Sequence, residues 1–435
     1  MLTILRQFEL QRKSAGSAFP ILLLGLLSVA ITGIHASIDQ ACANALQSVD
    51  QNDTDSTPIV AKLRIESNLQ IFGHPLALGD ALSILDSSDL KDCWHIPATI
   101  DSKALERAGV DLGVIPAGEF NAAGVCRRSA LRLMLARAAL GYAVVANGIV
   151  ITTKDCADTY GIANSARPTI EGLHHGDREA RRDTVFAAGY WRLESRIWIP
   201  HLIDLLTDAD RDVQFNSAYA IAAFGSEAID AVEGLNLLLV SDDSSMREVA
   251  KFALSRIGPA AVNRLTTEIE NPEIKIARVA AGALGDMGIT GRLAMADLID
   301  IATRHLATDQ LTHENDYCER CDLIAMAISR VGIGGNFDWL TRLMKSPNPG
   351  ERALAAKICG ELGASGVVFV PALQAMLSDQ AVTVRRKAAW AMAQLDLPAD
   401  TESSFLEAAE RDSDRHVTLW AAVALRKLRA TQNNE

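Results

Sequence analysis

The chain has 435 residues, of which 49% are hydrophobic and 5% aromatic, and its formal net charge is −12 at pH 7. This length predicts two or three domains, and the apolar fraction is sufficient for packed cores. The acidic balance argues against nucleic acid as a ligand, because phosphate binding requires concentrated lysine and arginine. The basic residues Arg178, Arg181 and Arg182 lie among acidic ones, so we interpret them as a solvated helix face.

Residues 1–36 have the pattern of a signal peptide or a membrane anchor. Arg6, Arg12 and Lys13 precede an apolar run from Ala18 to Ile34, and the small residue Ala36 follows it. Such a run is on the border between a signal-peptide core and a membrane span of about 20 residues. We expect export with cleavage near Ala36. The alternative is an uncleaved inner-membrane anchor that leaves the rest of the chain facing the periplasm.

Polar residues 37–58 indicate a linker, and residues 59–155 have the mixed pattern of a small α/β domain. Residues 59–70 and 94–100 are strand-like, whereas 75–85, 102–108 and 125–137 have helical spacing. The last of these helices would turn Ala130, Leu131, Met134 and Leu135 inward. Residues 142–153 predict a hairpin that turns at Asn147-Gly148.

This domain resembles the short N-terminal domain of secretins and TonB-dependent transducers. The resemblance is carried by residues 74–82, by 100–110, and by the stretch from 131–135 to 150–153. It implies a small βαβ module for protein contacts in the periplasm, not an enzyme. No barrel or secretin pore follows the module here, so a role in secretion does not carry over.

From Pro168 onward a motif returns about every 33 residues, which predicts stacked helix pairs. Its clearest copies are Met246–Gly258 and Glu351–Gly363. The residues that end the second helix of each pair are Arg192, Gly225, Gly258, Gly288, Gly332, Gly363, Asp396 and Arg429. Glycine suits this place because it accepts the left-handed backbone conformation.

Two apolar positions precede each of these ends and would form a buried stripe. Four residues before the end are Ala188, Ile221, Leu254, Leu284, Ile328, Cys359, Met392 and Leu425. One residue before it are Trp191, Phe224, Ile257, Met287, Val331, Leu362, Leu395 and Leu428.

The pattern resembles bacterial HEAT repeats of the phycobilisome-lyase-like type over residues 168–430. Arg247, Arg352 and Arg385 take the arginine position of these repeats, and Arg181 fits it loosely. Other copies depart there, with Gln214, Ala277, Cys321 and Thr418. Acidic residues before the second helices also fit the family: Asp208, Asp210, Asp242, Asp243 and Asp379. The resemblance implies a mainly α protein, a right-handed α-solenoid of about eight helix pairs that serves as a binding platform.

Some members of that repeat class attach chromophores to proteins, so an enzyme of this type is the alternative function. The sequence contains no phosphate-binding loop, no nucleophile elbow and no His-Glu-x-x-His metal helix. We therefore expect no cofactor and no catalytic residues.

One cluster has ligand-like spacing. Cys318 and Cys321 follow His305 and His313, so these four residues would form a Cys2His2 zinc site. A redox-active disulfide and structural thiols at the start of a helix are the other interpretations. With seven cysteines in an exported chain other disulfides are also open, and spacing does not identify a pairing.

A second candidate site lies six residues before each repeat end, on the side of the second helices opposite the buried stripe. The residues there are Phe186, Tyr219, Phe252, Gly282, Met326, Lys357, Trp390 and Val423. With Tyr190 and Phe215 beside them, Phe186, Tyr219, Phe252 and Trp390 are the candidate partner-binding residues. Ordinary packing between repeats is the competing interpretation, and docking of the chain's own N-terminal module is a further one.

These patterns favour a non-catalytic scaffold or adaptor of the bacterial cell envelope. Protein partners would bind to the solenoid and to the N-terminal module. An enzyme that uses the cysteine cluster, or a purely structural spacer, is the alternative.

Overall fold

The computed structural model describes residues 62–65, 70–71, 78–85, 94, 96–113, 115, 120–121, 123–145, 148–191, 193–308, 319–331 and 337–434. These residues form two compact units that divide after Pro168. The expected signal or anchor segment (1–36) and the linker (37–58) lie outside the described residues. Within the described ranges, no helix has the length and apolar character needed to cross a membrane.

The first unit contains a three-stranded sheet in the order β2-β5-β4. Strand β2 (Ala98–Ile100) runs parallel to β5 (Gly148–Thr153), and β5 pairs antiparallel with β4 (Leu140–Val145), which confirms the predicted hairpin. A second sheet pairs β1 (Gln70–Ile71) antiparallel with β3 (Phe120–Asn121). The strand predicted over 59–70 is wrong for Lys62 and Leu63, which are helical.

The predicted helices of this unit are present with small changes at their ends. They are α4 (Leu78–Ala81) with the 3-10 turn η1 (Leu82–Leu85), α5 (Ser102–Ala108) and α6 (Arg127–Ala136). Asp101 begins α5 by accepting a hydrogen bond from the Ala104 N–H at 3.1 Å. The four residues expected to face inward from α6 are all buried.

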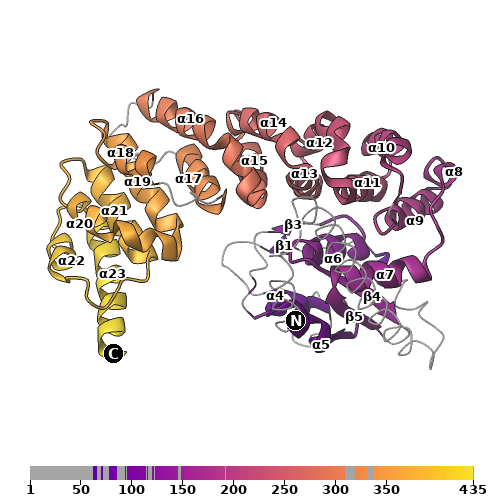
Figure 1. The fold of residues 1–435 in the computed structure, drawn as a ribbon, viewed down its shortest axis with the longest axis horizontal. Coiled ribbons are helices and arrows are strands. Elements are labelled where there is room, and N and C mark those ends of the chain that lie inside the picture. Colours follow the sequence, from indigo (N-terminus) through magenta and orange to yellow (C-terminus); the bar gives the residue numbers. More distant parts are fainter. Residues whose placement is uncertain are drawn as a thin grey trace, which may run out of the picture. The chain divides into compact units, whose positions relative to one another are not determined.

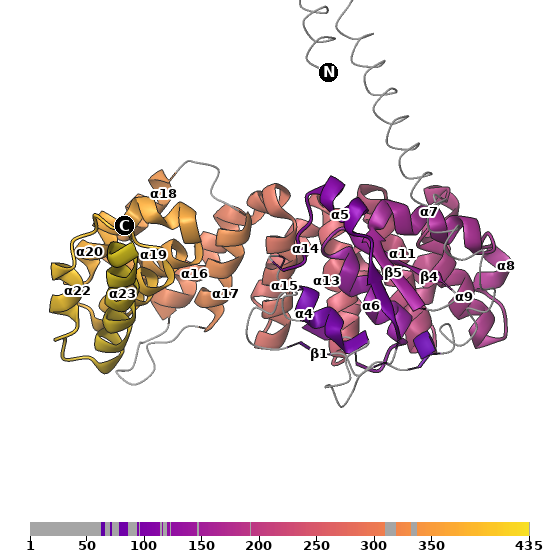
Figure 2. The same cartoon turned by 90° about the horizontal axis from the view of Figure 1, so that it is seen from below.

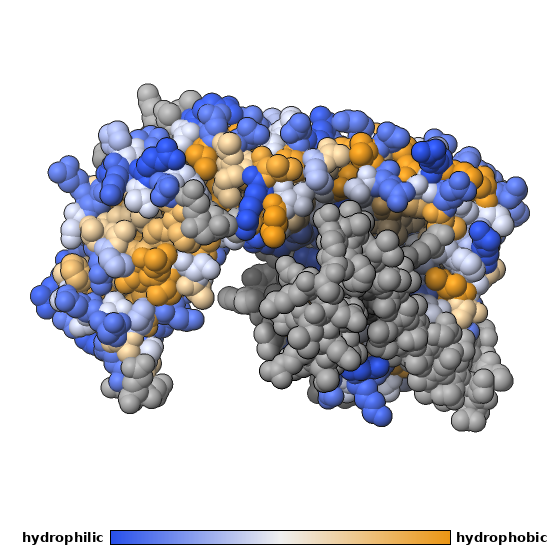
Figure 3. Space-filling view, in the orientation of Figure 1, coloured by the Kyte–Doolittle hydropathy of each residue, from blue (hydrophilic) through white to orange (hydrophobic). Residues whose placement is uncertain are grey.

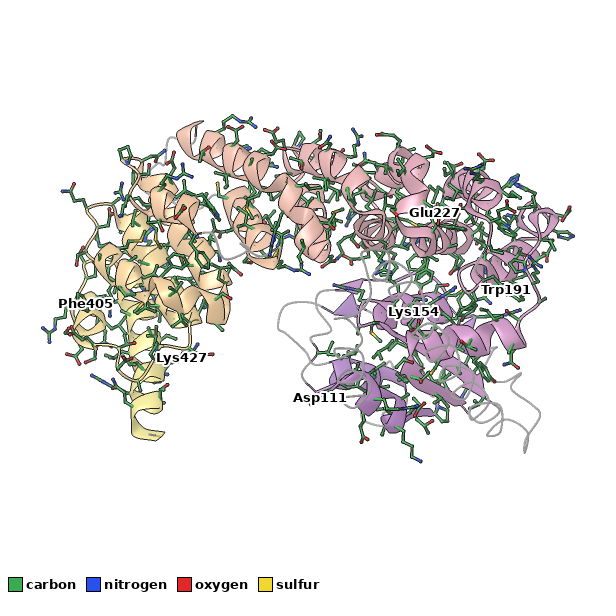
Figure 4. The ribbon with its side chains drawn as sticks, viewed as in Figure 1. Asp111, Lys154, Trp191, Glu227, Phe405 and Lys427 are labelled. Carbon is green, nitrogen blue, oxygen red and sulfur yellow. The ribbon has the colours of Figure 1, made fainter. Side chains whose placement is uncertain are left out.

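A further helix, α7 (Lys154–Asn164), was not predicted from the sequence. It packs on β4, where Gly141 leaves room for the Ala157 methyl group, and its Tyr160 hydroxyl donates to the Val144 carbonyl at 2.8 Å. Figure 4 labels Lys154 at the start of α7. The first unit therefore extends past the hairpin to Pro168.

The second unit consists, in its described part, of eight successive helix pairs (Figure 1). The 90° view in Figure 2 shows the same order along the chain. The first helices, with their 3-10 turns, are α8 (Ile170–Leu173), α10 (Ser195–Asp204) with η2 (Leu205–Thr207), η3 (Gly225–Ala231) with α12 (Val232–Leu239), α14 (Pro259–Ile269), η4 (Gly288–Ala294) with α16 (Met295–Thr308), α18 (Asp338–Met344), η5 (Gly363–Phe369) with α20 (Val370–Met376), and α22 (Ser404–Ala409). The second helices are α9 (Arg178–Ala188), α11 (Arg211–Phe224), α13 (Ser244–Ile257), α15 (Ile274–Asp286), α17 (Glu319–Val331), α19 (Pro349–Glu361), α21 (Val382–Gln394) and α23 (Arg415–Asn434).

The glycines predicted to end second helices have positive φ angles where they are described. Gly225 and Gly258 have φ of 56° and 79°, with ψ near −130°. Side chains strongly disfavour this backbone region, so it favours glycine even more than the expected left-handed helical conformation does. Gly332 lies outside the described residues.

The buried stripe is confirmed in full at one of its two positions. All eight residues four before the repeat end are at most 1% exposed. At the other position Ile257, Val331, Leu395 and Leu428 are buried, but Trp191, Phe224, Met287 and Leu362 keep part of their surface exposed. The prediction of a buried residue is therefore wrong at these four, of which Phe224 is the last residue of α11 and the other three follow the ends of their helices.

Candidate partner-binding face of the solenoid

Bidentate arginine–aspartate pairs join successive repeats where the second helices begin. Arg181 donates to Asp208 from Nε at 3.0 Å and from Nη2 at 3.1 Å. Arg352 pairs with Asp379 at 2.8 Å through both nitrogens, and Arg385 pairs with Asp412 at 2.7 and 3.1 Å. In each case the aspartate follows 27 residues later, in the next repeat. This planar, two-bond geometry is the one for which arginine is suited.

The third nitrogen of each arginine closes the turn of its own repeat. Nη1 of Arg352 donates to the Ser346 carbonyl at 2.8 Å, six residues earlier, and Arg181 and Arg385 make the equivalent bond. Gln214 and Arg247 also bond the carbonyl six residues earlier, at 2.8 and 2.6 Å. Arg181 is therefore a full member of the arginine set, and the loose fit inferred from its sequence context is wrong. The solvated helix face expected for these arginines is therefore wrong for Arg181 and Arg182, which pair with acidic residues of the next repeat.

A second set of pairs runs beside the first. Arg182 bonds Asp210 at 2.8 and 2.6 Å, and Arg386 bonds Asp414 at 3.0 and 2.6 Å. The same aspartates cap the following helices: Asp414 Oδ1 accepts from the backbone N–H groups of His416 and Val417. One carboxylate thus holds two repeats together and starts a helix.

These contacts shift the acidity of the aspartates. Hydrogen bonds from Arg352 and Arg385 hold the pKa values of Asp379 and Asp412 below their usual range. The bond from Arg386 lowers the pKa of Asp414 to about 2. All three aspartates therefore serve as ionised partners of the repeat arginines, and of these only Asp379 was among the acidic residues predicted for the turns.

The middle of the solenoid uses a different arrangement. In α15 the arginine position is occupied by Ala277, which cannot reach the carbonyl six residues earlier, that of Asn271. Arg320, at the start of α17, reaches back instead and donates Nη2 to the Asn271 carbonyl at 2.9 Å and Nη1 to that of Ile269. The next repeat thus supplies the missing guanidinium.

We call the residues six before each repeat end the inner strip: Phe186, Tyr219, Phe252, Gly282, Met326, Lys357, Trp390 and Val423. Adjacent members contact each other. The rings of Tyr219 and Phe252 are stacked, with centroids 5.6 Å apart and planes 14° apart. Lys357 Nζ lies 3.5 Å from the centroid of the Trp390 ring, and it also pairs with Glu361 at 2.8 Å. Contact between repeats is therefore one role of the inner strip.

Most of the inner strip nevertheless keeps part of its surface exposed. Phe186, Phe252 and Trp390 are half-buried, as is Tyr190, whose ring meets that of Phe186 edge-on at 5.5 Å. Phe215 and Tyr219 differ, with 0% and 4% exposed. A partner contact by these six residues remains a prediction, and Phe215 and Tyr219 add to the packing in this structure.

Two charged contacts lie beside the inner strip, and they were not predicted from the sequence. Lys387 Nζ reaches Asp322 at 3.0 Å, 65 residues earlier and two repeats away. Lys251 pairs with Glu248 at 2.7 Å, beside Gly282. The sequence signal that could have revealed the Lys387–Asp322 pair is the separation of these residues, which is close to twice the repeat length. Figure 3 shows hydrophobic and hydrophilic side chains interspersed over the visible face of the repeats.

The candidate zinc ligands lie only partly within the described residues. Cys321 is buried at 4% exposure, and its thiol donates to the Ala302 carbonyl at 3.8 Å, as expected of a structural thiol. His305 lies in the last turn of α16, and His313 and Cys318 are outside the described residues. The described cysteines, Cys126, Cys156, Cys321 and Cys359, are buried and carry no disulfide. The described ranges contain no group of three or more metal-ligating residues.

Comparison with known proteins supports the repeat architecture. The family model for HEAT repeats matches residues 166–255 and 337–429. The fold is accordingly mainly α, a HEAT-type solenoid preceded by a small unit with a three-stranded sheet. No curated protein matches the sequence.

The chain is also similar to several solved structures. One is an engineered protein, at 19% identity over 60% of this chain and 77% of that one, with a TM-score of 0.26. Another is Kap121p bound to Pho4p, at 14% identity over 60% and 33%, with a TM-score of 0.41. A third is the complex of CpcE and CpcF of phycocyanin lyase from Nostoc sp. PCC7120, at 19% identity over 56% and 89%, with a TM-score of 0.27. The chain thus spans about a third of the length of Kap121p.

Proposed function

We propose that this protein is a non-catalytic, protein-binding scaffold or adaptor of the bacterial cell envelope. The observation that carries the proposal is a set of half-buried rings, those of Phe186, Phe252 and Trp390 on second helices and that of Tyr190 just after α9. Partly exposed aromatic residues on a rigid framework are typical anchors of protein interfaces, because they bury large areas with little loss of side-chain freedom.

The inner strip changes character along the solenoid. Rings occupy it in the first three repeats, whereas Lys357 and the neighbouring Glu361 introduce charge in the sixth. The first repeats would supply affinity and the later ones selectivity, because charges at an interface mainly discriminate between partners.

The envelope location rests on the apolar run from Ala18 to Ile34 with basic residues before it. The N-terminal module, with its resemblance to periplasmic contact domains, would provide a second binding surface. This part of the proposal is tested by the location of the protein in fractionated cells.

The chemistry of Cys321 and Cys359 argues against a thiol-dependent enzyme that uses either residue. Burial raises the pKa of the Cys359 thiol, and the Cys321 thiol is engaged with a carbonyl. Reactive cysteines are exposed and have lowered pKa values, so these two thiols lack the properties of nucleophiles.

Site-specific crosslinking in living cells tests the proposal. A photoreactive amino acid is placed at Phe186 or Phe252, and at Leu237 as the matched control. Leu237 is a hydrophobic residue of α12 that is 62% exposed, but it lies on a first helix, away from the inner strip. We expect a protein adduct of defined mass from positions 186 and 252 and none from 237.

Two results would contradict this expectation. Equal adducts from all three positions would indicate nonspecific contact, and the absence of any adduct from the inner strip would leave it a packing surface. A crosslink to residues 62–168 of the same chain would identify the N-terminal module as the occupant instead of a separate protein. Phe252→Ser should weaken the specific adduct at position 186 while the circular dichroism of the protein stays helical.

A further inference from the structure

Two histidine rings meet at the start of the solenoid. Nε2 of His174 lies 3.0 Å from Nδ1 of His201, and the ring centroids are 5.0 Å apart at an angle of 70°. His174 follows α8 as its C-cap residue, and His201 lies in the last turn of α10. The pair therefore connects the first helices of two neighbouring repeats, and it does not belong to the inner strip or to the candidate zinc cluster.

The separation of the two nitrogens suits a shared metal ion. With a metal–nitrogen bond of about 2.0–2.1 Å, nitrogens that occupy neighbouring corners of a square-planar or octahedral site lie about 2.9 Å apart. The nitrogens of a tetrahedral site would be about 3.3–3.4 Å apart. The observed 3.0 Å is the length of an ordinary hydrogen bond between the two rings, and it is also short enough for both nitrogens to reach one ion of Cu²⁺ or Ni²⁺, which prefer tetragonal sites.

The surroundings of the pair favour a cation. His174 is exposed and His201 half-buried, so water can fill the remaining coordination positions. The exposed residues Glu171 and Asp204 stand three residues from His174 and His201 in the sequence and add negative charge to this region, but they do not form a group of three or more ligands with the two rings. Arg181 donates to the carbonyl of His175, next to His174, but its positive charge is paired with Asp208.

We propose that His174 and His201 form a two-histidine binding site for Cu²⁺ or Ni²⁺, with water completing the coordination. In the free protein one ring donates its N–H to the other. On metal binding that proton moves to the second nitrogen of the same ring, so that both facing nitrogens present lone pairs to the ion and the two rings remain neutral. The site joins α8 to α10, so bound metal should stabilise the first repeats.

Copper titration of the untagged protein at neutral pH tests this site. We expect an equivalent of Cu²⁺ whose electron paramagnetic resonance spectrum shows coupling to two imidazole nitrogens. His174→Gln and His201→Gln should each weaken binding by at least about tenfold, because a single remaining imidazole loses the chelate. NiCl2 should raise the melting temperature of the parent protein and leave that of both variants unchanged.

His175 provides the matched control. It is an exposed histidine next to His174, but its Nδ1 accepts a hydrogen bond from the Asp177 N–H at 3.1 Å and its ring is not part of the pair. His175→Gln should retain parental copper binding. Equal binding by all three variants, or loss in His175→Gln alone, would overturn the proposal. The readout is independent of partner binding, so the scaffold proposal and the metal site can fail separately.

Discussion

At the Asn271 carbonyl, the guanidinium that closes the turn comes from the following repeat. Arg320 takes over this bond because Ala277 stands where Arg247, Arg352 and Arg385 stand in other repeats. Buried carbonyls need a donor, and a charged donor contributes about 1.5–3 kcal/mol. Any side chain that is long enough and close enough can thus donate to a turn carbonyl, and it need not occupy the usual arginine position of the repeat.

Two substitutions test whether Arg320 takes the place of the arginine that is absent at position 277. Arg320→Ala should lower the free energy of unfolding by about 1–3 kcal/mol, because two turn carbonyls lose their donor. Adding Ala277→Arg should restore part of the lost stability, since an arginine at the equivalent position of other repeats donates to the carbonyl of its own turn. Urea unfolding measures both. Arg342→Ala, which removes an exposed residue bonded only within its own helix, should change stability by less than about 0.5 kcal/mol.

The pairs of the last repeats also predict a pH dependence. The folded protein lowers the pKa of Asp414 from 3.8 to about 2 and lowers that of Asp412 as well. A lowered carboxyl pKa adds stability above the unfolded value, and this contribution is lost as the pH falls from about 4 toward 2. Asp414→Asn should cost about 1–2 kcal/mol at pH 7 and little at pH 2. Thermal melts across this range would show parallel curves for parent and variant if the inference is wrong.

At the scale of the helices, close approach depends on small residues. A Cβ atom at Gly360 of α19 would lie 2.5 Å from Cζ3 of Trp390 and 2.9 Å from the Cα of Ala391 in α21. At Gly282 of α15 the nearest atom would be Cδ of Lys251, at 3.3 Å, on a flexible side chain. The first glycine is required for packing, whereas at the second a methyl group needs only a small shift of the flexible Lys251 side chain.

The two glycines should respond in opposite directions to the same substitution. Gly360→Ala should destabilise the protein by about 1–3 kcal/mol, because α19 and α21 must separate around the indole ring. Gly282→Ala should be neutral or stabilise by up to about 1 kcal/mol through its higher helix propensity. Equal effects in chemical denaturation would show that helix propensity, not packing, decides both positions.

The second helices were predictable because their apolar spacing repeats, so that Leu254 or Met392 marks the core by position alone. Helix α7 was not, because its buried residues Cys156, Ala157 and Tyr160 are few among polar ones. The contacts of the candidate site were the hardest to predict. The spacing placed Lys357 and Trp390 on one line, but only the structure shows that they contact each other.

Over the whole solenoid, the regular arginine–aspartate pairs occur in the first repeats and in the last ones. The match to the HEAT family model ends at residue 255 and resumes at 337, so it omits the same middle part. There the described repeats are joined by the two bonds of Arg320 and by the pairs Arg278–Glu319 and Arg330–Asp286, and these two pairs are more exposed than the regular ones. Exposed pairs contribute only about 0–1 kcal/mol each.

This difference predicts uneven local stability along the second unit. Amide hydrogens of α15 and α17 should exchange faster than those of α19 and α21, because fewer strong contacts oppose local opening. Hydrogen–deuterium exchange followed by mass spectrometry measures this difference. Uniform protection from α9 to α23 would show that apolar packing alone sets the stability.

The fixed offset of the regular pairs has a consequence for how the chain can change in length. Arg352 and Arg385 are 33 residues apart (385 − 352), and so are their partners Asp379 and Asp412 (412 − 379). Excising residues 353–385 would therefore leave Arg352 at the right distance from Asp412, with its own turn carbonyl intact. The arginine–aspartate pairing can thus survive the loss or duplication of a whole repeat, whereas the pair of Lys387 with Asp322, which spans two repeats, cannot survive that excision. A similar excision that includes Arg320 would remove the donor to the Asn271 carbonyl. The repeat that contains Asn271 therefore depends on the next one.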